Sequence, residues 1–366
     1  MNKFNYNEVA LKNLQIQDTS VLDRLVDYES AREAHVKKDH SQRDKRMSLK
    51  EAVTEFVSDG DIYTDSGFSY VRSANQALME VVRQNKKDLQ MIGSPNACSS
   101  FLIATGNVKY AHASYQGAEM RGYDRHYSIA LKTKKFRILS DWSHGAMALG
   151  FKAAQLGLPG LFCKNLLGSD IINYNPYVRE TQNIMRNDRD EVVFVPALFP
   201  DVSIIHVQKA DKFGNGFIYG PTVNDVAMAS AARKVILTAE EIVPTSEFRN
   251  NNKGVVIPFA CVNAVVELPF GAIPGSCPGY YYWSRQWWEK YFRYAAMNEE
   301  NMQKFLEYWL TCKDQYEFLD RLGGAKWIVE SRRQTLAAEY QNEDDRFDFS
   351  YREWQAGIKP EDELYY

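Results

Sequence analysis

The chain has 366 residues, of which 45% are hydrophobic and 25% are charged, and its formal net charge is −3. This composition is that of an ordinary globular protein with enough length to bury a large core. A slightly acidic chain has no electrostatic footprint for nucleic acid or for an anionic membrane, so both classes of partner are excluded.

Signals for membrane insertion, secretion and metal binding are missing as well. No run of 18 apolar residues occurs, and residues 1–6 lack the apolar core of a signal peptide. The five cysteines are scattered without a Cys-x-x-Cys pair, and the six histidines form no metal-type cluster. The sequence therefore predicts a protein of the reducing cytoplasm with no metal and no permanently bound cofactor.

Residues 1–46 are polar and precede the main body of the chain. Their apolar residues have partial helical spacing. These residues are Leu14, Val21, Leu22, Leu25 and Val26. The spacing predicts a helix that leads into an exposed helical arm, and we expect this arm to pack against another subunit without a catalytic role.

The main α/β domain is expected over residues 47–279. Ser48 is a suitable N-cap for its first helix, and Glu51 completes a capping box. Gly60 ends this helix, and residues 61–64 are expected to form the first strand.

A short loop, Ser66-Gly67-Phe68, joins this strand to a helix expected over about residues 72–85. In a strand–loop–helix unit, backbone N–H groups can face an anion or a developing oxyanion. Ser66, Gly67 and Phe68 are therefore candidates for binding substrate. The alternative is a plain turn that binds nothing, as is true of most such turns.

Two further strands are expected at residues 89–92 and 108–114, and Glu119 follows the second of them. Open α/β sheets bind ligands just beyond the carboxyl ends of their strands. Glu119 is therefore a candidate catalytic residue. The alternative is a solvated loop glutamate, which is the commonest kind.

A fourth strand, residues 137–139, leads through Asp141, Ser143 and His144 into another helix. His144 lies in a strand-to-helix turn beside acidic and hydroxyl groups, which suits acid–base chemistry near neutral pH. Ser143 or Asp141 is expected to cap the helix, and Ser143 is a candidate for binding substrate. The alternative for His144 is a hydrogen-bonded turn histidine.

The stretch of residues 196–225 contains a β-branched strand at residues 202–207 and a glycine-rich turn. Gly214, Gly216 and Gly220 are not a dinucleotide fingerprint, because they lie between two expected strands and do not lead from a strand into a helix. Further strands alternate with helices as far as residue 267. This alternation predicts an α/β fold with an open, mostly parallel sheet.

Aromatic residues are dense in the segment of residues 280–294, which opens an expected helical part of the same domain over residues 280–340. Aromatic side chains interleaved with basic ones can stack on nucleic acid bases, but this chain has no net positive charge to hold the phosphates. An interface with another subunit is the preferred interpretation. Residues 341–366 form an acidic tail.

Several of these patches together resemble one family. They are Leu-Gly-Ser-Asp at residues 167–170, Pro-Ala-Leu-Phe-Pro-Asp-Val at 196–202, His206-Val207, Ala-Asp-Lys-Phe-Gly-Asn at 210–215 and Pro-Phe-Gly-Ala-Ile-Pro-Gly at 269–275. Over roughly residues 47–330 the chain resembles the A subunit of family I coenzyme A transferases, of the glutaconate CoA-transferase type.

The resemblance implies a single large domain of helices around an open parallel sheet, paired with a homologous B subunit in an α2β2 or larger assembly. It also implies that a coenzyme A thioester and a carboxylic acid are the substrates, and that a glutamate of the B subunit is the nucleophile. Two residues depart from the family pattern. Ser66 replaces a glycine of the loop after the first strand, and Asp141 replaces a glutamate.

Two alternatives remain open. In the first, the chain belongs to a hydrolase branch that cleaves a C–C or thioester bond of a cyclic acyl-CoA, and His144 and Glu119 supply the acid–base chemistry. In the second, the chain is a non-catalytic scaffold subunit, for which the glycine lost at Ser66 is the one supporting feature.

Overall fold

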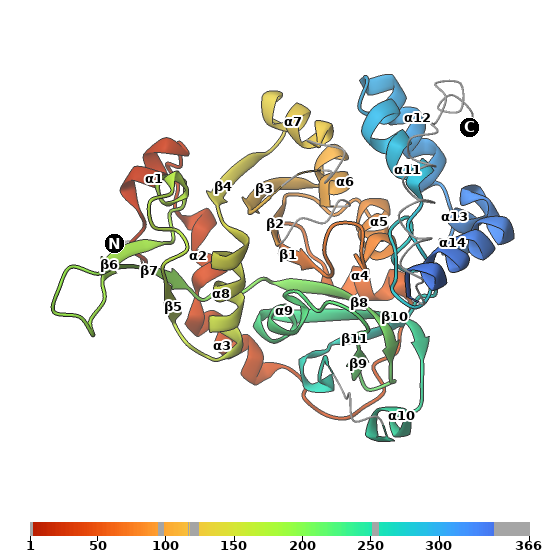
Figure 1. Ribbon diagram of the computed structural model, residues 1–366, viewed down its shortest axis with the longest axis horizontal. Coiled ribbons are helices and arrows are strands. Elements are labelled where there is room, and N and C mark those ends of the chain that lie inside the picture. Colours follow the sequence, from red (N-terminus) through yellow and green to blue (C-terminus); the bar gives the residue numbers. More distant parts are fainter. Residues whose placement is uncertain (1–2, 94–98, 116, 118–123, 251–255, 340–366) are drawn as a thin grey trace.

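The computed structural model describes residues 3–93, 99–115, 117, 124–250 and 256–339 (Figure 1). Within these residues the largest sheet has eight strands, in the order β11-β10-β8-β1-β2-β3-β4, and β9 pairs with β8 beside this path. Neighbours along the path are parallel, and β9 is antiparallel to β8. The expected open, mostly parallel sheet is confirmed. Its strands are β1 (Ile62–Asp65), β2 (Leu89–Gly93), β3 (Val108–Ala113), β4 (Arg137–Asp141), β8 (Val202–Ala210), β9 (Gly216–Phe217), β10 (Lys234–Ile242) and β11 (Ala264–Glu267).

Helices cover both faces of this sheet. One face carries α4 (Leu49–Phe56), α5 (Asn75–Arg83), α6 (Ser99–Ala104) and α7 (Arg125–Lys132), and the other carries α8 (His144–Gln155) and α9 (Asp225–Ala231). Successive strand residues enter different cores, as the two-residue period of a strand requires. Tyr63 of β1 packs in the first core and Ile62 in the second.

Local sequence signals explain where these elements begin and turn. The capping box expected at α4 is present, since Ser48 Oγ accepts from the Glu51 N–H at 3.2 Å and the Glu51 carboxylate accepts from the Ser48 N–H at 2.9 Å. The turn that contains Gly214 lies between β8 and β9, two antiparallel strands, as expected from the sequence.

A second, antiparallel sheet of three strands lies beside the N-terminal helices (Figure 1). Its order is β5-β7-β6, with β5 (Gly160–Cys163), β6 (Arg179–Gln182) and β7 (Glu191–Pro196). This sheet was not expected from the sequence. Its outer strands have only four residues each, and β6 is polar and largely exposed, so β6 lacks the apolar pattern that indicates a strand.

The N-terminal segment forms α1 (Glu8–Asn13), α2 (Ser20–Val26) and α3 (Tyr28–Lys37). The five apolar residues whose spacing predicted a helix, Leu14, Val21, Leu22, Leu25 and Val26, pack within the chain itself. Leu22 and Leu25 are buried in the same core as Phe151 of α8, and the Phe199 N–H donates to the Leu25 carbonyl at 2.8 Å. The arm expected from the sequence thus packs against its own chain.

The aromatic C-terminal part also packs inward. It comprises α11 (Arg285–Glu289), the π-helical turn η4 (Lys290–Ala295), α12 (Glu299–Leu310), α13 (Gln315–Leu322) and α14 (Gly324–Glu339). Trp287, Trp288 and Tyr291 are buried in the core that also contains α5 and α6. The expected subunit interface is therefore wrong for these three side chains, because their own domain covers them. The expected acidic tail lies outside the described residues.

Three short helices complete the described structure. They are η2 (Asp170–Tyr174), α10 (Thr245–Asn250) and η3 (Phe259–Cys261). None of the helices in the described ranges is both long and apolar enough to span a membrane.

Candidate functional site

The carboxyl ends of β1, β3 and β4 bring three loops together at one edge of the sheet, as expected for parallel neighbours. The loop after β1 carries Phe68, the residues after β3 are Ser114 and Tyr115, and the turn after β4 carries Ser143 and His144. Two of the sequence-predicted candidates, Phe68 and His144, therefore meet here.

His144 is the first residue of α8 and is exposed. Its Nδ1 lies 3.0 Å from Ser114 Oγ. The ring centroids of Phe68 and Tyr115 lie 6.0 and 6.1 Å from the imidazole centroid, and both rings meet it edge to face. Phe68 and Tyr115 are themselves partly exposed, so the imidazole sits between two aromatic walls that solvent and a ligand can reach.

Ser143 fulfils the expected capping role. Its side-chain oxygen accepts from the Ala146 N–H at 3.1 Å and so begins α8 beside His144. Gly145 follows, and a Cβ at this position would lie 2.6 Å from Asn165 Nδ2. The missing side chain thus lets the Asn165 amide approach the first turn of α8.

The backbone of the loop after β1 is occupied within the chain. The Ser66 N–H donates to the Ile204 carbonyl at 3.0 Å, the Gly67 N–H to Asp225 Oδ1 at 3.1 Å, and the Phe68 N–H to the Val71 carbonyl at 3.0 Å. Ser66 itself is fully buried. The loop therefore presents the Phe68 ring to the site, and these N–H groups do not have the arrangement that an oxyanion would need.

The Asp141 carboxyl group ends β4 close to the same turn. It is half-buried, and burial raises its pKa, although the Trp142 N–H that it accepts at 3.0 Å acts in the opposite direction. A carboxyl group with a raised pKa keeps its proton to higher pH and can serve as a proton donor. Glu119 lies outside the described residues, so its catalytic role stays a prediction.

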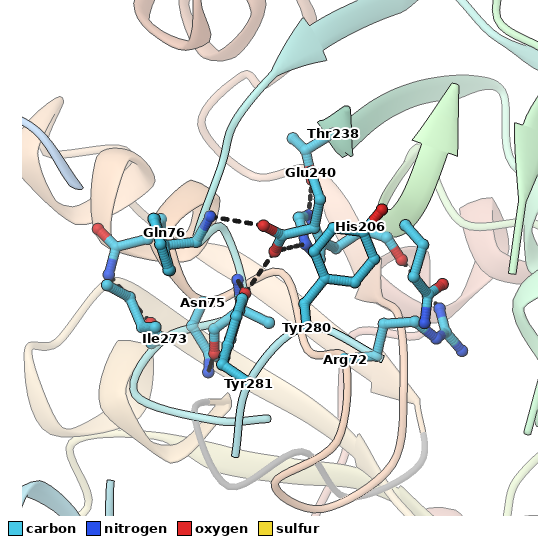
Figure 2. A network of polar contacts seen from close by, with 12 residues as sticks. Arg72, Asn75, Gln76, His206, Thr238, Glu240, Ile273, Tyr280 and Tyr281 are labelled. Atoms are coloured by element: carbon cyan, nitrogen blue, oxygen red, sulfur yellow. Dashed lines mark hydrogen bonds and ion pairs between the residues drawn. The ribbon is translucent and has the colours of Figure 1, made fainter. Parts of the chain in front are cut away.

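A buried network of polar side chains joins His206 of β8 to Thr238 and Glu240 of the neighbouring strand β10 (Figure 2). His206 Nε2 is 2.8 Å from Glu240 Oε1, and its Nδ1 is 2.9 Å from Thr238 Oγ1. The Tyr281 hydroxyl donates to the same carboxylate, and the Phe270 N–H donates to Glu240 Oε2 at 2.7 Å. The polar groups of His206, Glu240 and Tyr281 thus satisfy one another inside the protein, as burial requires.

The backbone of His206 connects this network to the loop after β1. The His206 N–H donates to Ser66 Oγ at 2.8 Å, and the His206 carbonyl accepts from Arg72 Nη1 at 2.9 Å. Arg72 also forms a fully buried ion pair with Asp225. The network thereby holds the loop that places Phe68 against His144.

His206, Glu240 and Cys277 are the one group in the described part of the chain with metal-type spacing, their ligand atoms lying within 4.8 Å of one another. Burial raises the pKa of the Cys277 thiol well above its usual range, which disfavours the thiolate that a metal would need. The Glu240 carboxylate is already occupied by Tyr281 and the Phe270 N–H. This cluster is a hydrogen-bond network, and its residues do not fit a metal centre.

Comparison with known proteins identifies the family. A family model described as coenzyme A transferase matches residues 46–268. The chain belongs to the coenzyme A transferase family.

Three relatives of this coenzyme A transferase chain are informative. An uncharacterized protein of Archaeoglobus fulgidus is 35% identical over 300 residues, which cover 81% of this chain and 66% of that protein. The A subunit of glutaconate CoA-transferase from Acidaminococcus fermentans is 31% identical over 301 residues, 78% of this chain and 93% of the relative. The cholesterol ring-cleaving hydrolase IpdA subunit of Rhodococcus jostii is 24% identical over 294 residues, 76% of this chain and 96% of the relative.

The crystal structure of the Acidaminococcus fermentans glutaconate coenzyme A-transferase has the same fold. Its chain superimposes with a TM-score of 0.73 at 29% identity, covering 78% of this chain and 94% of that one. The similarity to the A subunit of a family I transferase, inferred from sequence patches, is thereby confirmed.

Two residues of the candidate site in this transferase chain, Ser114 and Tyr115, were not expected from the sequence. A signal for them existed, since both stand at the end of the third expected strand, where an open parallel sheet places its ligands. No local signal pointed to the Arg72–Asp225 pair, whose members are 153 residues apart.

Proposed function

We propose that this chain is the A subunit of a hetero-oligomeric enzyme that moves coenzyme A between an acyl-CoA and a carboxylic acid. The observation that carries the proposal is the family match over residues 46–268, together with a shared fold over 78% of the chain with glutaconate CoA-transferase. The partner is a homologous B subunit.

Transfer of coenzyme A between carboxylic acids needs a carboxylate nucleophile that forms an acyl anhydride and then an enzyme-bound thioester. We place this nucleophile on the B subunit. The present chain contributes the residues at the carboxyl ends of β1, β3 and β4, where Phe68 supplies an apolar surface and His144 and Ser143 supply polar groups. Glu119 is proposed as a further polar contact.

His144 and Asp141 give this candidate site two groups that can exchange protons with the acyl group or the incoming carboxylic acid. The same pair would serve a hydrolase that uses water as the acceptor. The two reactions differ in one property, because transfer requires a second carboxylic acid and hydrolysis does not.

The test compares the purified chain, its purified B partner and their complex, with a short-chain acyl-CoA as donor and acetate as acceptor. We expect acetyl-CoA to form only with the complex, and only when acetate is present. Turnover of the acyl-CoA without acetate would favour the hydrolase, and transfer by the chain alone would contradict the placement of the nucleophile.

The variant His144→Gln tests the site itself. We expect kcat of the complex to fall about tenfold or more, because a positioned proton-transfer group is lost. His40→Gln is the matched control, since His40 is also exposed but its two ring nitrogens contact the carbonyls of His35 and Ala260. Equal kcat values for both variants would remove His144 from the proposed chemistry.

A further inference from the structure

The serine that follows β3 makes two hydrogen bonds that together determine where the proton of His144 lies. Ser114 Oγ is 3.0 Å from His144 Nδ1 and 3.2 Å from the Gly93 carbonyl oxygen. A hydroxyl group has a single proton to donate, and a carbonyl oxygen can only accept. If the proton pointed to His144, the lone pairs of Ser114 and Gly93 would face each other at 3.2 Å.

Both contacts are hydrogen bonds in one arrangement only, in which Ser114 donates to Gly93 and accepts from the Nδ1–H of His144. We infer that Ser114 is a positioning residue that holds neutral His144 with its proton on Nδ1, so that Nε2 is the basic nitrogen. The inference rests on the proposed function in one respect, because the tautomer matters for turnover only if His144 takes part in it.

The sheet fixes the positions of Gly93 and Ser114 relative to each other. Gly93 ends β2 and is paired in register with Ala113 of β3, directly before Ser114. The Phe68 and Tyr115 rings flank the imidazole edge to face and restrict its rotation. The pairing of β2 with β3 thus fixes the Ser114 hydroxyl between the Gly93 carbonyl and His144 Nδ1.

His112, on the strand β3 that leads to Ser114, shows the opposite arrangement. Nδ1 of His112 lies 2.8 Å from Ser140 Oγ, which also accepts from Trp142 Nε1 at 2.6 Å, and Nε2 faces Gln90 Oε1 at 3.3 Å. Only one proton is available to the neutral ring, so it belongs on Nε2. Burial lowers the pKa of His112 to about 3, which keeps this ring neutral near pH 7 and makes it an internal reference for the Nε2–H tautomer.

The tautomer can be read directly from long-range ¹H–¹⁵N correlation spectra of the full chain labelled with ¹⁵N-histidine, at a pH where imidazole is neutral. The His144 signals are assigned by their loss in His144→Gln. We expect the Nδ1–H pattern in the wild type and a shift toward the Nε2–H pattern, which solvated imidazole prefers, in Ser114→Ala. Ser114→Thr keeps the hydroxyl group and should restore the wild-type pattern.

Ser128→Ala is the control, because it also removes a serine hydroxyl that donates to a backbone carbonyl, that of Asp124 at 3.0 Å, but lies on α7. Ser114→Cys gives the same readout as Ser114→Ala if the alanine variant does not fold, since a thiol is a weak acceptor. A wild-type tautomer in Ser114→Ala, or in Ser114→Cys where the alanine variant does not fold, would overturn the inference.

Activity of the complex provides the second readout. We expect Ser114→Ala to lower kcat about tenfold with little change in KM, and Ser114→Thr to recover most of the loss. A changed tautomer with unchanged kcat would support the role of Ser114 in holding the ring and would contradict the proposed role of His144 in turnover. The tautomer therefore tests the role of Ser114, and kcat tests the role of His144, so failure of one is distinguishable from failure of the other.

Discussion

Gly67 shows, at the scale of single residues, how closely the chain approaches itself in the loop that presents Phe68. Its φ of +84° lies in the left-handed region, and a Cβ would stand 2.1 Å from the Val71 carbonyl oxygen and 2.7 Å from the Arg72 carbonyl carbon. Both neighbours are backbone atoms that a small side-chain motion cannot move. Glycine is therefore required here for two independent reasons.

Gly67→Ala is expected to lower the free energy of unfolding by about 3 kcal/mol, since backbone strain and overpacking add together. Gly60→Ala is the matched control, because Gly60 has a similar φ of +78° but a Cβ there would meet no other part of the chain within 4 Å. We expect the control to lose only about 1 kcal/mol. Urea unfolding measures both, and equal losses would show that the close approach at Gly67 has no energetic consequence.

At the scale of elements, the segment that follows α3 is tied to the body by two lysines. Lys38 Nζ donates to the carbonyls of Ala232 and Cys261 at 3.2 and 3.0 Å. Lys45 Nζ donates to the carbonyls of Phe259 and Val262, both at 2.8 Å. The two ammonium groups thus satisfy carbonyls at the end of α9 and around η3, at the cost of burying charge.

The stability of this contact should depend on pH. Burial lowers the pKa of Lys38 from its usual 10.5 to about 8. Below about pH 8 the lysine is charged in both states, and its burial opposes folding. Between about pH 8 and pH 10.5, Lys38 is protonated in the unfolded chain but not in the folded chain. The contribution of Lys38 to the free energy of unfolding therefore rises with pH in this range.

The variant Lys38→Met replaces the titrating ammonium group with an uncharged side chain of similar length. We expect the free energy of unfolding of the wild type, minus that of Lys38→Met, to increase between about pH 8 and about pH 10 by no more than about 1.4 kcal/mol per pH unit. The exposed neighbour Lys37 provides the control variant Lys37→Met, for which the difference should stay flat. A difference that falls with rising pH would contradict the burial of the Lys38 charge.

At the scale of the whole molecule, the C-terminal helices are part of the main core. Trp287 is fully buried, and its ring lies 5.1 Å from that of Phe305 and 6.4 Å from that of Phe101 of α6, measured between centroids. Figure 1 shows these helices stacked beside α5 and α6 at one end of the sheet. The aromatic segment thus contributes to the stability of the single chain.

Trp287→Ala is expected to destabilise the isolated chain by about 3–5 kcal/mol, the cost of truncating a large buried aromatic side chain. Tyr316→Ala on α13 is the control, since Tyr316 is half exposed, and its loss should stay within about 0.5 kcal/mol. The measurement is chemical unfolding of the chain without its partner. If Trp287→Ala left the isolated chain unchanged and weakened only the complex, this side chain would belong to an interface.

Much of the fold followed from local patterns. The strands at residues 61–64, 89–92, 108–114, 137–139 and 202–207 were expected within a few residues of their bounds, because each is a short apolar run near turn residues. The site followed less completely. His144 and Phe68 were expected and lie together, whereas Ser114 was missed, because its contact with His144 joins residues 30 positions apart.

The sequence by itself determined most strands of the main sheet and the family of the chain, because propensity, caps and motif patches are properties of neighbouring residues. Only the tertiary structure decided what each buried group faces. The Gly67 N–H meets Asp225, 158 residues away, and is not available to a substrate. The apolar faces of the N-terminal arm and of the aromatic helices are likewise buried against other parts of the chain. Burial removes apolar surface from water, but which surface covers it depends on the tertiary structure.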